Sequence, residues 1–383
     1  MLIDIKKDSL ISALQLVLRA VSSNNLIPIL AGIHIEARTS EIVFTTNNTR
    51  MTIRYRLAQD GHSVLIHRTG EIVVPARYFI EVIRKLSGGM ITLEMREGLN
   101  LAIVSSESQI RLRGLDPEEF PSIHNQDEHY LAKISINNAL LKSTIKQVAI
   151  AASSSEARPV LTGVLFDYNQ DYLNLMATDG IRLASRTIYT VKHVHNRVTS
   201  TKVLIPADHL NELTKLLKND DDTTEIATFS NQVRFTTNDL QIESVLIDGV
   251  FPTSMNVIPK SYISELLLES NRLLSAVECV SVLANKSVIQ LAATKNALLL
   301  FSQTPDIGDI QNEVPLVEMR GVDFTISLNA KLLVDLLRSI GSGKVRLRFA
   351  GELKPLVILP ENIDSSILFL ITPIRNPYLI HPQ

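Results

Sequence analysis

Apolar residues recur at helical spacing in three similar segments of the chain. The segments are LISALQLVLRAVS (Leu10–Ser22), LLKSTIKQVAIAAS (Leu140–Ser153) and LLSAVECVSVLA (Leu273–Ala284). In the first segment, Leu14 and Leu18 repeat the position of the first leucine after one and two helical turns. Each segment therefore predicts an amphipathic helix.

A second helix is predicted later in each third of the chain. Three segments each read as a short strand, a cap and a helix: VVPARYFIEVIRKL (Val73–Leu86), LIPADHLNELTKLL (Leu204–Leu217) and SLNAKLLVDLLRSI (Ser327–Ile340). Pro75 and Pro206 stand where a first-turn proline is tolerated, and Asn329 suits an N-cap. The chain therefore contains an internal repeat, which decides its architecture.

Shorter pieces recur in the same order. IPILAGIHI (27–35) resembles RPVLTGVLF (158–166), and GLDPEEFP (114–121) resembles LIDGVFP (246–252). Alternating strands lie between these pieces, for example Ile42–Thr46, Gln232–Thr237 and Val345–Phe349. The pattern predicts two helices and about eight strands per third, in the order strand–helix–strands twice over.

Domain boundaries are expected at two polar stretches, His124–His129 and Pro252–Lys260. They divide the chain into three α+β domains of about 125 residues, a common domain size. The expected domains are 1–123, 130–252 and 253–383.

Composition is that of a folded protein without a membrane span. Of 383 residues, 45% are hydrophobic and 20% charged, so each third can bury a core. Cys279 is the only cysteine, which excludes an intrachain disulfide framework and suits a reducing compartment. The first residues show no apolar leader, and nowhere do about 18 uncharged apolar residues run together. We therefore expect a cytoplasmic protein with no membrane partner.

Motifs for nucleotide and dinucleotide chemistry are incomplete or missing. GSGK at 341–344 lacks the glycine and the Ser or Thr of a phosphate loop, since Arg338 and Val345 occupy those positions. It predicts a turn between a helix and a strand. No G-x-S-x-G, H-E-x-x-H or Gly-rich dinucleotide fingerprint is present. These absences lower the odds of an enzyme and predict no cofactor.

Three further groups of residues could carry metal or acid–base chemistry. His193 and His195 form an H-x-H pair with no further ligand at zinc spacing, so exposed strand histidines are the better interpretation. Asp220–Asp222 reads as a solvated turn rather than a magnesium site. Thr178-Asp179-Gly180 reads as a turn between strands. No catalytic residue and no metal site are predicted.

Positive charge gathers on the predicted helices. Six windows over these helices hold 11 Lys or Arg and 5 Asp or Glu, a net charge of 11 − 5 = +6, against −2 for the whole chain. The helix cations are Arg19, Arg77, Arg84, Lys85, Lys142, Lys146, Lys215, Lys218, Arg272, Lys331 and Arg338. If the helices shared one side, that side would attract phosphates without reading sequence. Any amphipathic helix has a charged solvent face, so charge alone does not decide this point.

Nine stretches in order resemble the bacterial DNA polymerase III beta subunit, the sliding clamp. They are IPILAGI (27–33), VVPARYFIEVIRKLSG (73–88), GLDPEEFP (114–121), SSSEARPVLTGVLF (153–166), LMATDGIRLA (175–184), LIDGVFP (246–252), SQTPDIGD (302–309), VRLRFAGELKPLVILP (345–360) and ITPIR (371–375). The resemblance covers the chain from end to end.

The resemblance implies three sliding-clamp domains in a head-to-tail homodimer. Helices would line a ring around double-stranded DNA, held without sequence preference, and sheets would form the outer wall. It implies a processivity factor that does no chemistry. Its partners would be the DNA polymerase III alpha subunit, the clamp loader and repair polymerases, bound through short clamp-binding peptides.

The resemblance also places two protein-binding sites. The peptide cleft would consist of Leu161, Thr178, Gly180, Ile181, Leu183, Pro252, Val257, Pro355, Leu356, Leu370 and Thr372. Mostly apolar side chains with a glycine and prolines suit a preformed groove. The dimer interface would use Ile110, Leu112, Val282 and Leu283.

This chain departs from the family pattern at several of these places. Asn256 stands where the family often has arginine, Thr372 where it usually has Met or Leu, and Cys279 where arginine is usual. In loops that contact DNA in relatives, Asn24 and Ser155 are uncharged. These departures leave open a clamp-like paralogue with weak ring closure that binds partners. A second alternative, an enzyme, rests on His193 and His195 as its only plausible metal pair.

Overall fold

The computed structural model describes residues 1–21, 27–121, 130–169, 171–189, 192–193, 201–218, 222–252, 257–361 and 366–375. These residues form two compact units. Unit 1 holds those within 1–139, 192–198 and 215–246, and unit 2 holds those within 140–191, 199–214 and 247–383.

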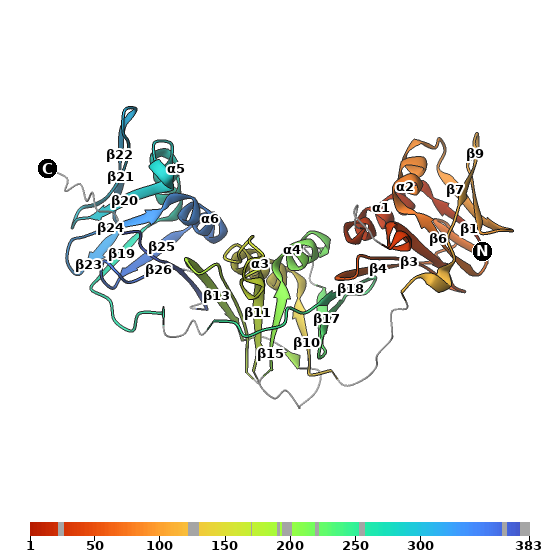
Figure 1. Cartoon of the computed structure of the whole chain (residues 1–383), viewed down its shortest axis with the longest axis horizontal. Helices are drawn as coiled ribbons and strands as arrows, with labels where there is room; N and C mark the ends of the chain where they lie inside the picture. Colours follow the sequence, from red (N-terminus) through yellow and green to blue (C-terminus); the bar gives the residue numbers. More distant parts are fainter. Residues whose placement is uncertain are drawn as a thin grey trace. The chain divides into compact units, whose positions relative to one another are not determined.

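Six α-helices occur in the described residues, two in each third of the chain (Figure 1). They are α1 (Lys7–Val17), α2 (Ala76–Lys85), α3 (Asn138–Ala149), α4 (Ala207–Leu216), α5 (Ser270–Ser281) and α6 (Ala330–Ile340). The second helix of each third follows its short strand as predicted, and the Asn329 side chain caps α6 by accepting a hydrogen bond from the Leu332 amide at 3.2 Å.

The first helix of each third begins and ends earlier than predicted. α1 starts at Lys7 instead of Leu10, and a 3₁₀ turn (Leu18–Ala20) follows it. The first turn is polar, so it carries no apolar signal, although the chain enters the helix directly from the preceding strand. At the other end of α5, Val282 is 78% exposed and lies beyond the helix. Apolar residues there had extended the prediction too far.

The strands repeat the same order in each third: strand, helix and three strands, twice over, with one short extra strand between the halves. The first third has β1 (Leu2–Lys6), β2 (Gly32–Ala37), β3 (Glu41–Asn47), β4 (Met51–Ala58), β5 (Val64–Arg68), β6 (Gly70–Pro75), β7 (Met90–Arg96), β8 (Asn100–Val104) and β9 (Gln109–Arg113). The second has β10 (Ala132–Asn137), β11 (Gly163–Tyr168), β12 (Leu173–Thr178), β13 (Arg182–Ile188), β14 (Lys192–His193), β15 (Thr201–Pro206), β16 (Thr223–Thr228), β17 (Gln232–Thr236) and β18 (Leu240–Val245). The last has β19 (Ser264–Glu269), β20 (Val288–Ala293), β21 (Ala297–Thr304), β22 (Gly308–Pro315), β23 (Glu318–Arg320), β24 (Phe324–Asn329), β25 (Lys344–Phe349), β26 (Leu356–Pro360) and β27 (Ile367–Ile371). The predicted repeat of strands and helices is confirmed.

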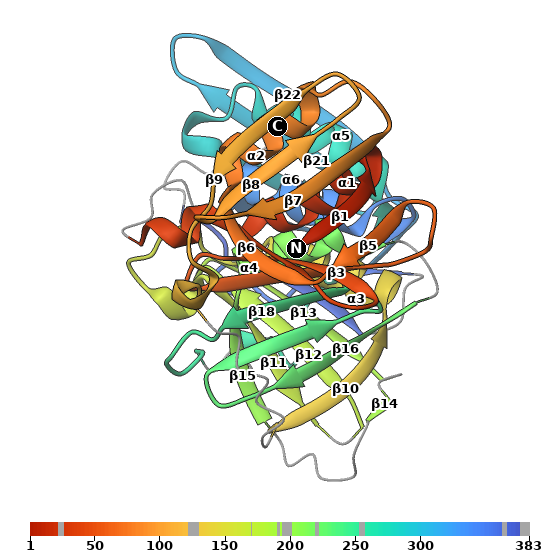
Figure 2. The same cartoon turned by 90° about the vertical axis from the view of Figure 1, so that its right-hand side faces the viewer.

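The strands join into four antiparallel sheets. Unit 1 contains β5-β1-β7-β8-β9 and the nine-stranded β14-β10-β16-β17-β18-β4-β3-β2-β6. Unit 2 contains β15-β11-β12-β13-β27-β26-β25-β19-β23 and β22-β21-β20-β24. The middle third therefore divides its strands between the two nine-stranded sheets: β10, β14 and β16–β18 join the sheet of unit 1, and β11–β13 and β15 join the sheet of unit 2. Figure 2 shows β7, β8 and β9 side by side.

The helices α1, α2, α5 and α6 bury apolar residues and contact strands of their own unit. Leu10, Ala13, Leu14 and Val17 of α1 are buried at positions that repeat every three or four residues, the pattern that the sequence shows. α1 contacts α2, and α5 contacts α6. The α6 helix ends at Gly341, whose φ of +79° suits glycine, and the predicted turn before β25 is confirmed.

A buried array of charged groups crosses the β4–β18 junction of unit 1. Glu243 on β18 is 9% exposed and accepts a hydrogen bond from Arg234 Nε at 2.7 Å and from Gln241 Nε2 at 2.9 Å. On β4, burial lowers the pKa of Arg54, and the charge of Glu243 opposes that shift. Glu243 therefore compensates two guanidinium groups on adjacent strands.

Replacing Glu243 with alanine should lower the free energy of unfolding by about 2–4 kcal/mol, because it leaves partly buried arginines uncompensated. Urea denaturation measures this loss. The matched control is Glu225→Ala in the same sheet, which breaks a more exposed pair with Lys133 at 3.0 Å. That change should lower stability by less than about 1 kcal/mol. Equal losses in the two variants would contradict the role assigned to Glu243.

Candidate peptide-binding cleft and basic helices

An apolar cavity of about 450 Å³ opens in unit 2, beside the turn that joins β12 to β13. This volume lies within the range of ligand-binding pockets. The cavity is lined by Arg158, Val160, Leu161, Thr178, Gly180, Ile181, Arg182, Leu183, Pro252, Val257, Leu370 and Thr372. The lining comes from four separate segments of the chain that pair or pack within one unit.

The floor of the cavity is buried and the rim is exposed. Leu183 on β13 lies opposite Leu370 on β27, and the two side chains are 5% and 2% exposed within one apolar cluster. At the rim, Ile181 and Val257 are 49% and 47% exposed. Large apolar side chains left open above a buried apolar floor offer a binding surface for apolar anchors.

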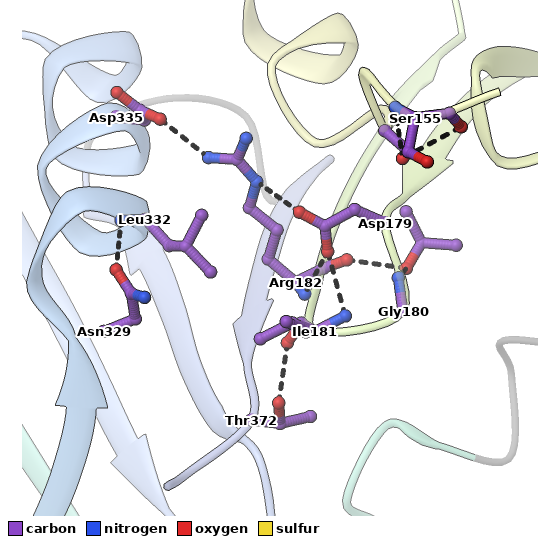
Figure 3. Close-up of polar contacts among 11 residues, drawn as sticks. Ser155, Asp179, Gly180, Ile181, Arg182, Asn329, Leu332, Asp335 and Thr372 are labelled. Atoms are coloured by element: carbon purple, nitrogen blue, oxygen red, sulfur yellow. Dashed lines mark hydrogen bonds and ion pairs between the residues drawn. The ribbon is translucent and has the colours of Figure 1, made fainter. Parts of the chain in front are cut away.

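The β12–β13 turn is fixed by its own polar groups (Figure 3). Asp179 Oδ1 accepts hydrogen bonds from the amides of Ile181 and Arg182, both at 2.9 Å. Gly180 has a φ of +92° and its amide donates to Thr178 Oγ1 at 3.1 Å. The predicted turn is confirmed, and it presents the backbone at 178–182 as one wall of the cavity.

Thr372 has a structural role at this wall. Its amide and its hydroxyl both donate to the Ile181 carbonyl, each at 2.9 Å. A Met or Leu at this position would lose the hydroxyl bond. The two bonds of Thr372 therefore fasten the turn to the end of β27.

Nine of the eleven residues expected in the cleft line this one cavity. Pro355 and Leu356 do not line it: both are buried, and Leu356 pairs with Ile371 across the sheet. The lining also includes Arg158, Val160 and Arg182, which the sequence reasoning missed. These three lie beside expected residues in the matching stretches, so adjacency was the available signal. Asn256 lies outside the described residues.

The helix cations lie on or directly beside the six helices. Ten of the eleven are exposed and Lys142 is half-buried. Arg77 pairs with Glu81 at 3.5 Å, Lys218 with Asp239 at 3.5 Å, and Arg338 with Glu278 at 2.7 Å. Glu81 and Glu278 are already subtracted in the net charge counted for the helices, so only the pair with Asp239 lowers the local positive charge further. Ser155 is exposed, and Asn24 lies outside the described residues.

The expected interface residues lie in two places, on an edge strand of unit 1 and directly after a helix of unit 2. Ile110 and Leu112 are half-buried on β9, an edge strand of unit 1. Val282 and Leu283 follow α5 in unit 2, and the Leu283 carbonyl accepts a hydrogen bond from Thr304 Oγ1 at 2.7 Å. Cys279 on α5 is exposed.

Within the described ranges, no group of three or more His, Cys, Asp and Glu side chains could hold a metal ion. His195, Asp220 and Asp221 lie outside those ranges, as does the His193 side chain. In the same ranges, no helix is long and apolar enough to cross a membrane.

The fold and the cleft define a class: a protein of repeated α+β units that carries an apolar groove on one unit. Models of the N-terminal, central and C-terminal domains of the DNA polymerase III beta subunit match residues 1–124, 135–253 and 255–375. The beta sliding clamps of Staphylococcus epidermidis and Staphylococcus aureus are each 32% identical to this chain over 378 residues, covering 97% of it and 98% of the relative.

Solved structures agree with the sequence matches. The DNA polymerase sliding clamp of Bacillus subtilis has a TM-score of 0.92 and 32% identity, covering 98% of this chain and 99% of its own. The DNA polymerase III beta chain of Streptococcus pneumoniae has a TM-score of 0.90 and 28% identity, covering 98% and 100%. The chain belongs to the DNA polymerase III beta subunit family, the bacterial beta sliding clamps.

Proposed function

We propose that two copies of this chain join head to tail into a ring that encircles double-stranded DNA and tethers DNA polymerase III for processive replication. Each copy contributes three clamp domains, 1–123, 130–252 and 253–383. The ring catalyses no reaction and works in the cytoplasm. Family membership and the near-complete coverage of each relative support this proposal, and they do not favour the alternative of a paralogue with weak closure.

The observation that carries the proposal is the pairing of equivalent strands. In the repeat, β4, β13 and β22 are the last strands of the first half of each third. The strands β9, β18 and β27 are the last strands of the second half. Within the chain, β18 pairs with β4 and β27 pairs with β13. Of these six strands, β9 and β22 lie at sheet edges. The repeat therefore supports pairing of β9 with the β22 of a second copy, twice over, which closes a ring.

The two free edges also have opposite charge. On β9 the exposed positions include Arg111 and Arg113, and on β22 they include Asp309 and Glu313. Opposite charges across paired strands stabilise the pairing, and two copies of the same edge would repel each other. Charge complementarity supports the head-to-tail arrangement over a symmetric β9–β9 contact.

Enclosure would make strong DNA contacts unnecessary. The helix cations would attract phosphate without specifying sequence, and their contribution would weaken as salt rises. The apolar cleft would hold short peptides of DNA polymerase III and of other clamp partners, a mode in which apolar anchors enter a preformed groove.

Solution mass tests this proposal. Light scattering at micromolar concentration should give twice the 42.6 kDa of one chain. A mass of one chain under these conditions would overturn the proposed ring and would return the weakly closing paralogue to consideration.

A further inference from the structure

We propose that Arg182 is a positioning residue that holds one wall of the cleft and ties it to the cation-bearing face of α6. The inference rests on the proposed function, because it concerns the affinity of the cleft for peptide and of the helices for DNA.

The Arg182 guanidinium lies between two carboxylates (Figure 3). Its Nε is 3.1 Å from Asp179 Oδ2, within the β12–β13 turn, and its Nη1 is 2.9 Å from Asp335 Oδ2 on α6. Asp179 also holds the turn through two backbone amides. Arg182 therefore joins the wall of the cavity to a helix 153 residues further along the chain.

Burial makes the Arg182–Asp179 half of this bridge stronger than a surface ion pair. The side chains of Arg182 and Asp179 are 10% and 16% exposed, and that of Asp335 is 49% exposed. Surface pairs contribute little because water screens them, whereas removing one partner of a mostly buried pair leaves a poorly solvated charge. The bridge therefore restrains the backbone at 178–182 before any peptide arrives, which reduces the ordering that binding requires.

The same bridge changes the charge of α6. Lys331, Asp335 and Arg338 are spaced by four and three residues, so they share one face of the helix. The carboxylate of Asp335 would repel phosphate on this face. Arg182 compensates the charge of that carboxylate through its ion pair. Arg182 thus favours both peptide binding and DNA binding, whereas Asp335 favours the first and opposes the second.

These opposite signs provide the test. Peptide affinity of the full chain is measured by anisotropy with a fluorescein-labelled pentapeptide that ends in two large apolar residues, because the cavity has an apolar lining. DNA affinity is measured with a labelled linear duplex at low salt. Arg182→Ala should bind peptide about tenfold more weakly and duplex more weakly. Asp335→Asn should bind peptide about threefold more weakly but duplex more tightly.

Further variants separate positioning from direct contact. If Arg182 acted only by touching peptide, Asp335→Asn would leave peptide affinity unchanged. In a positioning role, the double variant should bind peptide no more weakly than Arg182→Ala alone, because both changes break one bridge. Arg182→Lys should restore part of the affinity, since lysine can reach one carboxylate but cannot fork between two.

Glu278→Gln is the matched control, because it breaks the Arg338 pair on α6 without reaching the cleft. It should leave peptide affinity unchanged. The inference would be overturned if Arg182→Ala bound peptide within twofold of the parent chain. It would also be overturned if Glu278→Gln and Asp335→Asn lost peptide affinity equally. Failure of the parent chain itself to bind the peptide would instead overturn the proposed function of the cleft.

Discussion

Replacing Leu183 with lysine is expected to abolish peptide binding while the domain stays folded. Leu183 is 5% exposed at the floor of the cavity, opposite Leu370. A lysine there would reach into the open cavity and place an ammonium group where an apolar anchor must bind. The expected loss is at least about 100-fold in affinity, or about 2.8 kcal/mol.

The control for this variant is Leu353→Lys. Leu353 lies in the same unit, is 68% exposed and does not line the cavity. It should leave both affinity and melting temperature unchanged. If Leu183→Lys proves unstable, Ile181→Lys at the exposed rim gives the same test with little effect on folding. Unchanged peptide binding in a folded Leu183→Lys chain would show that the cleft lies elsewhere.

The combined change Ile110→Asp and Leu283→Asp should convert the dimer into a monomer. In the proposed ring, β9 of one copy meets β22 and the end of α5 of the second copy. Ile110 on β9 and Leu283 after α5 become buried in this contact. Two buried carboxylates would cost several kcal/mol unless neutralised, enough to shift a micromolar equilibrium fully toward monomer. Light scattering measures the outcome, and circular dichroism checks that the monomer stays folded.

Charge reversal on the two edges tests the pairing more specifically. A chain with Arg111→Glu and Arg113→Glu should be monomeric, and so should a chain with Asp309→Lys and Glu313→Lys. A chain with all four changes should regain a dimer, because it restores opposite charges across each β9–β22 contact. Persistent monomer in the fourfold variant would contradict pairing between these edges.

The sequence predicted the local elements well because their signals are local. The strand–cap–helix segments, the turn at Gly180 and the Asn329 cap follow from periodicity and from residue preferences that act over a few positions. The starts of the first helices were predicted too late because a polar first turn carries no apolar period. Their ends were also predicted too late, because exposed apolar residues beyond the helix, such as Val282, continue the apolar pattern.

Pairing between distant strands has no comparable signal. Nothing local indicates that Leu240 lies opposite Tyr55 or that Arg182 meets Asp335, because these contacts depend on how the half-repeats are shared between sheets. The same limit explains the cleft. Family motifs named its apolar floor. Alternation along a strand cannot say that Leu356 is buried while Arg182, which pairs with the same residue Ile371 from the other side, lines the cavity.

Retention on circular and linear DNA tests enclosure most directly. The parent chain is loaded onto nicked circular duplex, half of the sample is linearised with a restriction enzyme, and both halves are passed over a sizing column at moderate salt. A closed ring should stay on the circle and slide off the linear ends. Equal retention on the two forms, or equal loss from both, would contradict enclosure of DNA by this chain.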